Sequence, residues 1–381
     1  MARLITLFFF LVHVFPFFFV RSSLGLVPIL FIFFIILAYG IGWYLAHILT
    51  PKVNLEYITF TECRSMSILI VLLGYLLLRT PIIYEIIGAL TTGDFASYAL
   101  NRAISRYSGE TMGMIYNLGT VFFICYFGLI GTHLGLSEQK CFNETPAFNR
   151  NKNRWLAVIS LCFMVFVESS GLARAGVLLA LVLFTANYLY AKRVDYQNTS
   201  SKKLMTLSVK TLVIISFVFY FSAYLRLLDN DNALEVLIEK SYLYFVGGHE
   251  AFAMWLNQST EEIFSGYGFN TFTAVFKLFG VEDQSGHYTK YVNSGSNIFL
   301  LYRGLLQDFG FLFTSIFLAL ISFLANAGDG YKHQFPGLIY LTKAAICMLL
   351  FVFYSPFLFT TFLFGFLLSC LLQRKIFRRI V

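Results

Sequence analysis

Residues Leu24–Leu49 read LGLVPILFIFFIILAYGIGWYLAHIL, a run that contains no Asp, Glu, Lys or Arg. A bilayer core about 30 Å thick requires about 20 apolar residues per spanning helix, so this run predicts a transmembrane helix. The whole chain of 381 residues agrees, because 58% of its residues are hydrophobic and only 13% are charged. A soluble domain is about 25% charged. The composition therefore excludes a soluble globular protein, a disordered chain and a disulfide-stapled secreted module.

Similar apolar stretches recur along the chain, and we predict an all-α polytopic membrane protein with about ten transmembrane helices. The chain is interpreted as a single integral membrane domain over residues 1–381. The predicted spans are Leu4–Val20, Leu24–Leu49, Met66–Leu78, Met112–Leu136, Trp155–Ser169, Val177–Tyr190, Thr211–Leu225, Phe309–Asn326, Leu338–Tyr354 and Pro356–Leu372.

The basic residues indicate the orientation of these spans. With the N-terminus in the cytoplasm, 17 of the 28 Lys and Arg residues fall on the cytoplasmic side and ten fall outside. Short cytoplasmic loops carry such an excess of positive charge, so both termini are predicted to be cytoplasmic (N-in/C-in). The formal net charge of +8 then reflects membrane orientation, and we expect no nucleic-acid partner.

Two long loops are predicted on the outer face, at residues 79–111 and 226–308. The second covers roughly 80 residues between spans 7 and 8, and a loop of that length is usually functional. No cysteine falls in an outer loop, and no CxxC-type metal spacing or nucleotide-binding fingerprint occurs. We therefore expect chemistry on the outer face that uses neither a metal nor another cofactor.

The large loop resembles the principal outer loop of bacterial O-antigen polymerases, also called oligosaccharide repeat-unit polymerases. The turn Ser170–Gly176, which contains Arg174, is similar to a small-residue turn of these enzymes. The matching residues of the loop are Tyr244-Phe245-Val246-Gly247-Gly248, Ala251-Phe252, Gly266-Tyr267-Gly268, Thr271-Phe272, Asn297-Ile298-Phe299, Tyr302-Arg303 and Asp308-Phe309-Gly310. The resemblance implies a multi-pass enzyme of the bacterial inner membrane. It would join oligosaccharides carried on polyprenyl diphosphate at the periplasmic face.

The implied substrates need groups that bind the departing diphosphate, and arginine suits this task through its rigid, bidentate fork. Arg174, Arg303 and Arg226 are the diphosphate-binding candidates. Each has a structural alternative. Arg174 is also interpretable as a snorkelling charge at a helix end, Arg303 as a member of a surface salt bridge, and Arg226 as an interfacial anchor.

A sugar hydroxyl must also lose its proton, which suits a nearby His or carboxylate. The catalytic candidates are His249, Glu250, His287 and Asp308. The alternatives are ordinary loop polarity for the first three and an N-cap of the span that starts at Phe309 for Asp308. Three aromatic residues of the loop are expected either to stack on sugars or to pack in its core: Trp255, Tyr267 and Phe269.

Two ionisable residues lie at membrane depth, Glu168 and Lys343. Such groups are costly and usually paired or functional. We expect them to form a structural ion pair with each other, or Glu168 to orient Arg174 further along the same hairpin.

The function implied by the resemblance is polymerisation by a metal-independent glycosyltransferase. Its expected partners are the lipid-linked substrates, membrane lipids, a flippase that delivers the substrates and a chain-length regulator. Two alternatives stay open: an O-antigen ligase of similar architecture, and a flippase or transporter of lipid-linked oligosaccharides. Metal-dependent transferases that use polyprenyl-phosphate sugars resemble one another in carrying an acidic residue in the loop after the first span. Here that loop is Arg21-Ser22-Ser23 and contains no acid, so this class is disfavoured.

Overall fold

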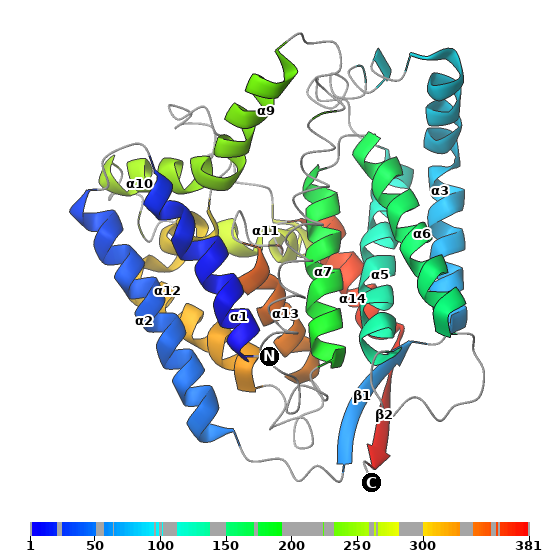
Figure 1. Ribbon diagram of the computed structural model, residues 1–381. Coiled ribbons are helices and arrows are strands. Elements are labelled where there is room, and N and C mark those ends of the chain that lie inside the picture. The colour runs from blue at the N-terminus through cyan, green and yellow to red at the C-terminus, as the bar shows by residue number, and fades with distance from the viewer. Residues whose placement is uncertain are drawn as a thin grey trace. The chain divides into compact units, whose positions relative to one another are not determined.

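The computed structural model of the chain is helical (Figure 1). It describes residues 2–20, 25–50, 57–63, 65–94, 97–98, 101, 113–137, 150–170, 174–192, 224, 232–258, 263, 266–281, 300–327, 338–351, 356 and 359–379. The chain, predicted as one domain, forms two compact units. Unit 1 comprises Met1–Leu55 and Glu239–Leu363, and unit 2 comprises Glu56–Ile238 and Phe364–Val381.

Within the described ranges, four helices are long and apolar enough to cross a membrane: Leu26–Leu49, Met66–Thr92, Met114–Leu136 and Leu301–Ala327. Shorter apolar helices occupy Ile5–Phe19, Ala157–Ser169, Gly176–Ala191, Leu338–Leu350 and Thr360–Leu371. The prediction of a helical membrane protein is thereby confirmed at this level. The predicted span Thr211–Leu225 lies, apart from Tyr224, outside the described residues.

Unit 1 contains nearly all of the described residues that carry the resemblance. Its helical elements are α1 (Ala2–Phe9), η1 (Phe10–Val14), η2 (Phe15–Phe19), α2 (Leu26–Leu49), η5 (Leu243–Gly247), α10 (Gly248–Gln258), α11 (Phe269–Leu278), α12 (Leu301–Ala327) and α13 (Leu338–Leu350). Two further helices cross the boundary between the units, α9 (Ala233–Tyr242) and α14 (Thr360–Leu371).

The two long helices of unit 1, α2 and α12, pack closely against each other. A Cβ atom at Gly42 would collide with the carbonyl oxygen of Ala319. The Ser322 hydroxyl donates a hydrogen bond to the carbonyl oxygen of Tyr39 at 2.8 Å. Small residues allow membrane helices to approach in this way, so α2 forms a scaffold against which α12 is held.

Unit 2 is built from α3 (Ser65–Thr92), α5 (Met114–Ser137), α6 (Arg150–Ser170) and α7 (Arg174–Lys192). Its closest helix pair is α5 with α7. A Cβ atom at Gly131 would collide with the Phe184 carbonyl oxygen, and one at Gly135 would lie 2.7 Å from the Tyr188 carbonyl oxygen. The small residues of α5 therefore place the backbones of α5 and α7 in direct contact.

A two-stranded antiparallel ribbon, which the all-α prediction missed, completes unit 2. Strand β1 (Tyr57–Cys63) pairs with β2 (Gln373–Arg379). Gln373, at the start of β2, donates to the Thr132 hydroxyl at 3.1 Å and to the Asn187 side-chain oxygen at 3.2 Å. Buried side-chain hydrogen bonds thus connect the ribbon to α5 and α7.

Two predicted span boundaries are wrong. The helix predicted to end at Leu78 continues through Arg79 and Pro81 to Thr92, so the first outer loop does not begin at residue 79. The helix predicted to start at Phe309 starts at Leu301, so the large loop ends before Asp308. In both cases a charged side chain interrupts the apolar run but is buried within the fold.

Candidate functional site

The first two turns of α12, Leu301–Asp308, are buried at every residue. Gly310 then interrupts the helix with φ 64° and ψ −176°, a conformation that glycine adopts most readily. The Thr314 hydroxyl bridges the break by donating to the Leu305 carbonyl oxygen at 2.9 Å. Two of the predicted site residues, Arg303 and Asp308, therefore lie on a short helical segment enclosed by the rest of unit 1.

Asp308 binds the N-terminus of α11. One carboxylate oxygen, Oδ1, accepts from the backbone N–H of Asn270 at 3.1 Å and from its side-chain amide at 2.9 Å, and Oδ2 accepts from the Thr271 N–H at 2.6 Å. The residue that precedes α11, Gly268, has no side chain to cap the helix. The expected N-cap of the helix starting at Phe309 is therefore wrong, because Asp308 caps α11 instead.

The turn before α11, which contains Gly266, packs closely against the carboxylate of Asp308. The Gly266 N–H donates to the Gln307 carbonyl oxygen at 2.8 Å. A Cβ atom at Gly266 would overlap Asp308 Oδ1 and the side-chain nitrogen of Asn270. Two stretches that carry the resemblance, one around Gly266 and one around Asp308, are thus in direct contact.

Arg303 lies on the same segment and is fully buried. Its guanidinium carbon is 5.3 Å from the ring centroid of Trp255, itself 1% exposed on α10. A cation over an indole face is attracted by the ring quadrupole, more strongly when both groups are desolvated. The arrangement differs from an exposed surface salt bridge and holds a positive charge beside an aromatic wall.

A buried histidine, which the sequence analysis did not single out, lies next to this segment. His13 belongs to the π-helical turn η1. Its Nε2 is 2.7 Å from the Leu349 carbonyl oxygen, and its Nδ1 is 2.7 Å from the Tyr302 hydroxyl. Since a carbonyl oxygen only accepts, Nε2 donates, and Nδ1 of the neutral ring accepts from Tyr302. His13 thereby ties η1 to the residue that precedes Arg303 and to α13.

His249 and Glu250 are adjacent on α10 but have different surroundings. His249 is 1% exposed, and its ring packs edge-on against Phe17 with the centroids 4.7 Å apart. Glu250 is half-buried, and its Oε2 accepts a hydrogen bond from the Tyr242 hydroxyl at 2.9 Å. The catalytic roles of both stay predictions.

The side chains of the remaining predicted site residues, Arg174, Arg226 and His287, lie outside the described part of the chain. Arg174 begins α7 in unit 2, and its side chain lies outside the described part of the chain. Arg226 and His287 fall entirely outside the described residues. A shared diphosphate site of Arg174 and Arg303 therefore stays a prediction.

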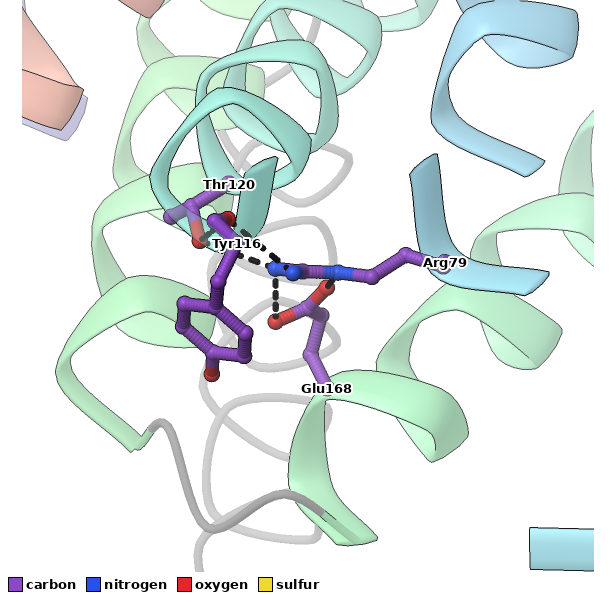
Figure 2. Close-up of polar contacts among 4 residues, drawn as sticks. All are labelled: Arg79, Tyr116, Thr120 and Glu168. Atoms are coloured by element: carbon purple, nitrogen blue, oxygen red, sulfur yellow. Dashed lines mark hydrogen bonds and ion pairs between the residues drawn. The ribbon is translucent and has the colours of Figure 1, made fainter. Parts of the chain in front are cut away.

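Glu168 pairs with Arg79 of the same unit, a partner that the sequence did not lead us to expect. Arg79 Nε lies 2.6 Å from Glu168 Oε1, and Nη2 lies 3.1 Å from Oε2 (Figure 2). Arg79 is fully buried and Glu168 is 3% exposed. Arg79 was not predicted as the partner, because the third span was expected to end at Leu78.

Among the described residues, no group of three or more His, Cys, Asp or Glu side chains is arranged to hold a metal ion. No family model, curated protein or solved structure matches the chain.

Proposed function

We propose that the protein is an O-antigen (surface polysaccharide) polymerase of the bacterial inner membrane. It would transfer the growing chain from its polyprenyl diphosphate onto the non-reducing end of a new lipid-linked repeat unit. A flippase would supply the substrates, and a chain-length regulator would act with the enzyme.

The observation that carries this proposal is the contact between Asp308 and the first turn of α11. It joins two of the separate stretches on which the resemblance rests, although the two residues Thr271 and Asp308 are 37 positions apart. Arg303 lies within two turns of Asp308 on the same buried segment. The fold thus supports one assembled region in unit 1 rather than unconnected short patterns.

The buried charge suits the chemistry of a diphosphate leaving group. A hydroxyl oxygen of the new unit would attack the anomeric carbon of the growing chain. The bond from that carbon to the diphosphate oxygen would break, and its electron pair would depart with the diphosphate. We assign stabilisation of this developing negative charge to Arg303, with Arg174 and Arg226 as further candidates.

The hydroxyl proton needs an acceptor, and Glu250 is our choice for the base. Its carboxylate is half-buried and already placed by Tyr242, whereas the His249 ring is enclosed by Phe17 and its surroundings. The carboxylate of Asp308 is engaged by backbone N–H groups. We therefore assign Asp308 a positioning role, and His287 remains the alternative base.

We propose about ten spans with both termini in the cytoplasm. The pairing of β1 with β2 supports this topology. Two paired strands outside the membrane lie on the same side, so the chain must cross an even number of times between Cys63 and Gln373. The predicted spans give eight crossings in that interval.

The experiment that tests the proposal combines gene deletion with complementation. Loss of a polymerase leaves a single repeat unit on the lipid A core, whereas loss of a ligase leaves no repeat unit attached. Complementation with wild type should restore the long-chain ladder on a gel. Arg303→Ala and Arg174→Lys should reach the membrane at normal level and give single units only. Lys277→Ala, which removes an exposed charge on α11, is the matched control and should restore the ladder.

Two results would contradict this proposal. A deletion strain without any repeat unit on its core would favour the ligase. Normal-length polymer from both arginine variants would remove the assigned roles of these two residues.

One observation favours a second function, a flippase of lipid-linked oligosaccharides. The Arg79–Glu168 pair is buried in apolar helices, and charged groups at membrane depth often mark transport pathways. Reconstitution in liposomes with a fluorescent lipid-linked oligosaccharide would distinguish the two functions. A polymerase should leave the rate of transbilayer movement at that of protein-free liposomes.

A further inference from the structure

The ion pair between Arg79 and Glu168 is assembled from three helices of unit 2. Arg79 comes from α3 and Glu168 from α6, and α5 contributes the Thr120 hydroxyl and the Tyr116 carbonyl oxygen. Figure 2 shows Tyr116, Thr120 and Glu168 around the guanidinium of Arg79. A single side chain thus holds α3, α5 and α6 together.

The guanidinium is nearly saturated by these contacts. Nε and Nη2 donate to the two carboxylate oxygens of Glu168, Nη2 also donates to Thr120 at 2.9 Å, and Nη1 donates to Tyr116 at 3.0 Å. The Arg79 guanidinium carbon also lies 4.1 Å from the centroid of the Tyr116 ring. Arginine, unlike lysine, can make all of these contacts at once because its fork is planar and rigid.

The surface of α5 is shaped to receive this group. Tyr116, Gly119 and Thr120 are three and four positions apart, so they share one face of the helix. A Cβ atom at Gly119 would lie 2.9 Å from the guanidinium carbon of Arg79. The absence of a side chain there lets the charge lie directly against the helix.

The position of Glu168 in the chain links the pair to the next helix. Glu168 lies in the last turn of α6, which ends at Ser170, and α7 begins at Arg174. The start of α7 therefore follows within four residues of a helix end that is held by the ion pair. The rest of α7 is held against α5 at Gly131 and Gly135.

We infer that Arg79 and Glu168 are positioning residues that fix the end of α6 and hence the backbone of Arg174. The inference rests on the proposed function in so far as Arg174 binds a diphosphate. Its structural part, that the pair orders the start of α7, stands without any assumption about activity.

Hydrogen exchange of the purified full chain, followed by mass spectrometry, tests the structural part. Glu168→Gln keeps the shape of the side chain and removes its charge. Amide exchange in peptides that cover residues 164–182 should rise about tenfold, while peptides from α2 and α12 should be unchanged. Glu168→Asp, which keeps the charge on a shorter arm, should give a smaller rise in the same peptides and serves if the first variant does not fold.

Ser160→Ala is the matched control, because it removes another contact between α5 and α6. The Ser160 hydroxyl lies 2.6 Å from the Tyr126 hydroxyl, two turns before Glu168. This variant should leave exchange at the start of α7 unchanged. Unchanged exchange over residues 164–182 in both Glu168 variants would overturn the inference. An equal rise across α2 and α12 would also overturn it, since the pair would then only stabilise the whole fold.

Polymer formation is measured on the same proteins. Glu168→Gln should lower the rate about tenfold, Glu168→Asp should lower it less because it keeps the charge that holds Arg79, and Ser160→Ala should leave the rate unchanged. An unchanged rate in Glu168→Gln, alongside raised exchange at the start of α7, would overturn the link to Arg174. If the exchange result holds but wild type makes no polymer, the positioning role stands and the proposed function fails.

Discussion

The backbone N–H of Thr271 donates a hydrogen bond to the carboxylate of Asp308 at 2.6 Å, across 37 residues of sequence. The same carboxylate accepts from the N–H of Asn270. A cap of this kind normally comes from the residue directly before a helix. Here it comes from a different helix, so the position of α11 depends on the buried start of α12.

Replacing Asp308 should therefore release α11. Asp308→Ala removes the cap and leaves buried N–H donors without an acceptor, at a cost of about 1–3 kcal/mol. Asp308→Asn keeps one oxygen acceptor and should cost less. The melting temperatures of the purified proteins in detergent should rank wild type, Asp308→Asn and Asp308→Ala in descending order. Equal melting temperatures for all three would contradict the capping role.

The contact between α2 and α12 predicts a difference between two glycines in one helix. Gly42→Ala would place a methyl group against the Ala319 carbonyl oxygen, whereas nothing lies within 4 Å of a Cβ atom at Gly40. Overpacking costs about 1–3 kcal/mol, so Gly42→Ala should lower the melting temperature. Gly40→Ala is the matched control and should leave the melting temperature unchanged or raise it. An equal decrease in melting temperature for Gly42→Ala and Gly40→Ala would contradict the close contact between α2 and α12.

The two buried hydrogen bonds of His13 predict that this residue contributes to the stability of the fold. His13→Phe leaves the Tyr302 hydroxyl and the Leu349 carbonyl oxygen without this partner, while Tyr302→Phe removes one hydrogen bond only. An orphaned buried polar group costs about 1–3 kcal/mol. His13→Phe should therefore destabilise the protein more than Tyr302→Phe, as measured by thermal unfolding. The reverse order would contradict a structural role for the two hydrogen bonds of His13.

The packing of Arg303 on Trp255 predicts an effect on substrate binding. Trp255→Phe keeps an aromatic ring but weakens the attraction for the guanidinium by about 1 kcal/mol, which corresponds to about fivefold in KM for the lipid-linked donor. Trp43→Phe is the matched control, because Trp43 is 40% exposed on α2. KM is measured with purified enzyme and a synthetic lipid-linked repeat unit. An unchanged KM in Trp255→Phe would separate Arg303 from diphosphate binding.

The parts of the fold that depend on local composition were predictable from the sequence. The helix Leu26–Leu49 follows from an apolar run without charge, because length and hydropathy decide whether a segment spans the bilayer. The helix start at Leu301 did not follow, since Arg303 and Asp308 make the segment resemble a loop. The buried helix tolerates these charges because Trp255 packs against Arg303 and the N-terminus of α11 binds Asp308, and both partners are distant in sequence.

The same reason explains the error at Arg79. A charged residue followed closely by proline predicts the end of a transmembrane helix, yet α3 continues past both Arg79 and Pro81. The helix continues with a buried charge because Glu168 neutralises Arg79 from 89 positions away. The sequence predicted which types of residue the candidate site would contain. Two of these residues, Arg303 and Asp308, lie on the same buried helical segment. The partners of Arg303 and Asp308 could not be predicted from the hydrophobic pattern of the sequence, because they are brought together only by tertiary contacts.

The pairing of β1 with β2 has a consequence for biogenesis. Strand β1 leaves the ribosome early, whereas β2 emerges only after every helix from α3 to α14 has been synthesised. All of the sequence between the two parts of unit 2, Glu239–Leu363, belongs to unit 1. The helices α3, α5, α6 and α7 are therefore synthesised long before the strand that completes their unit.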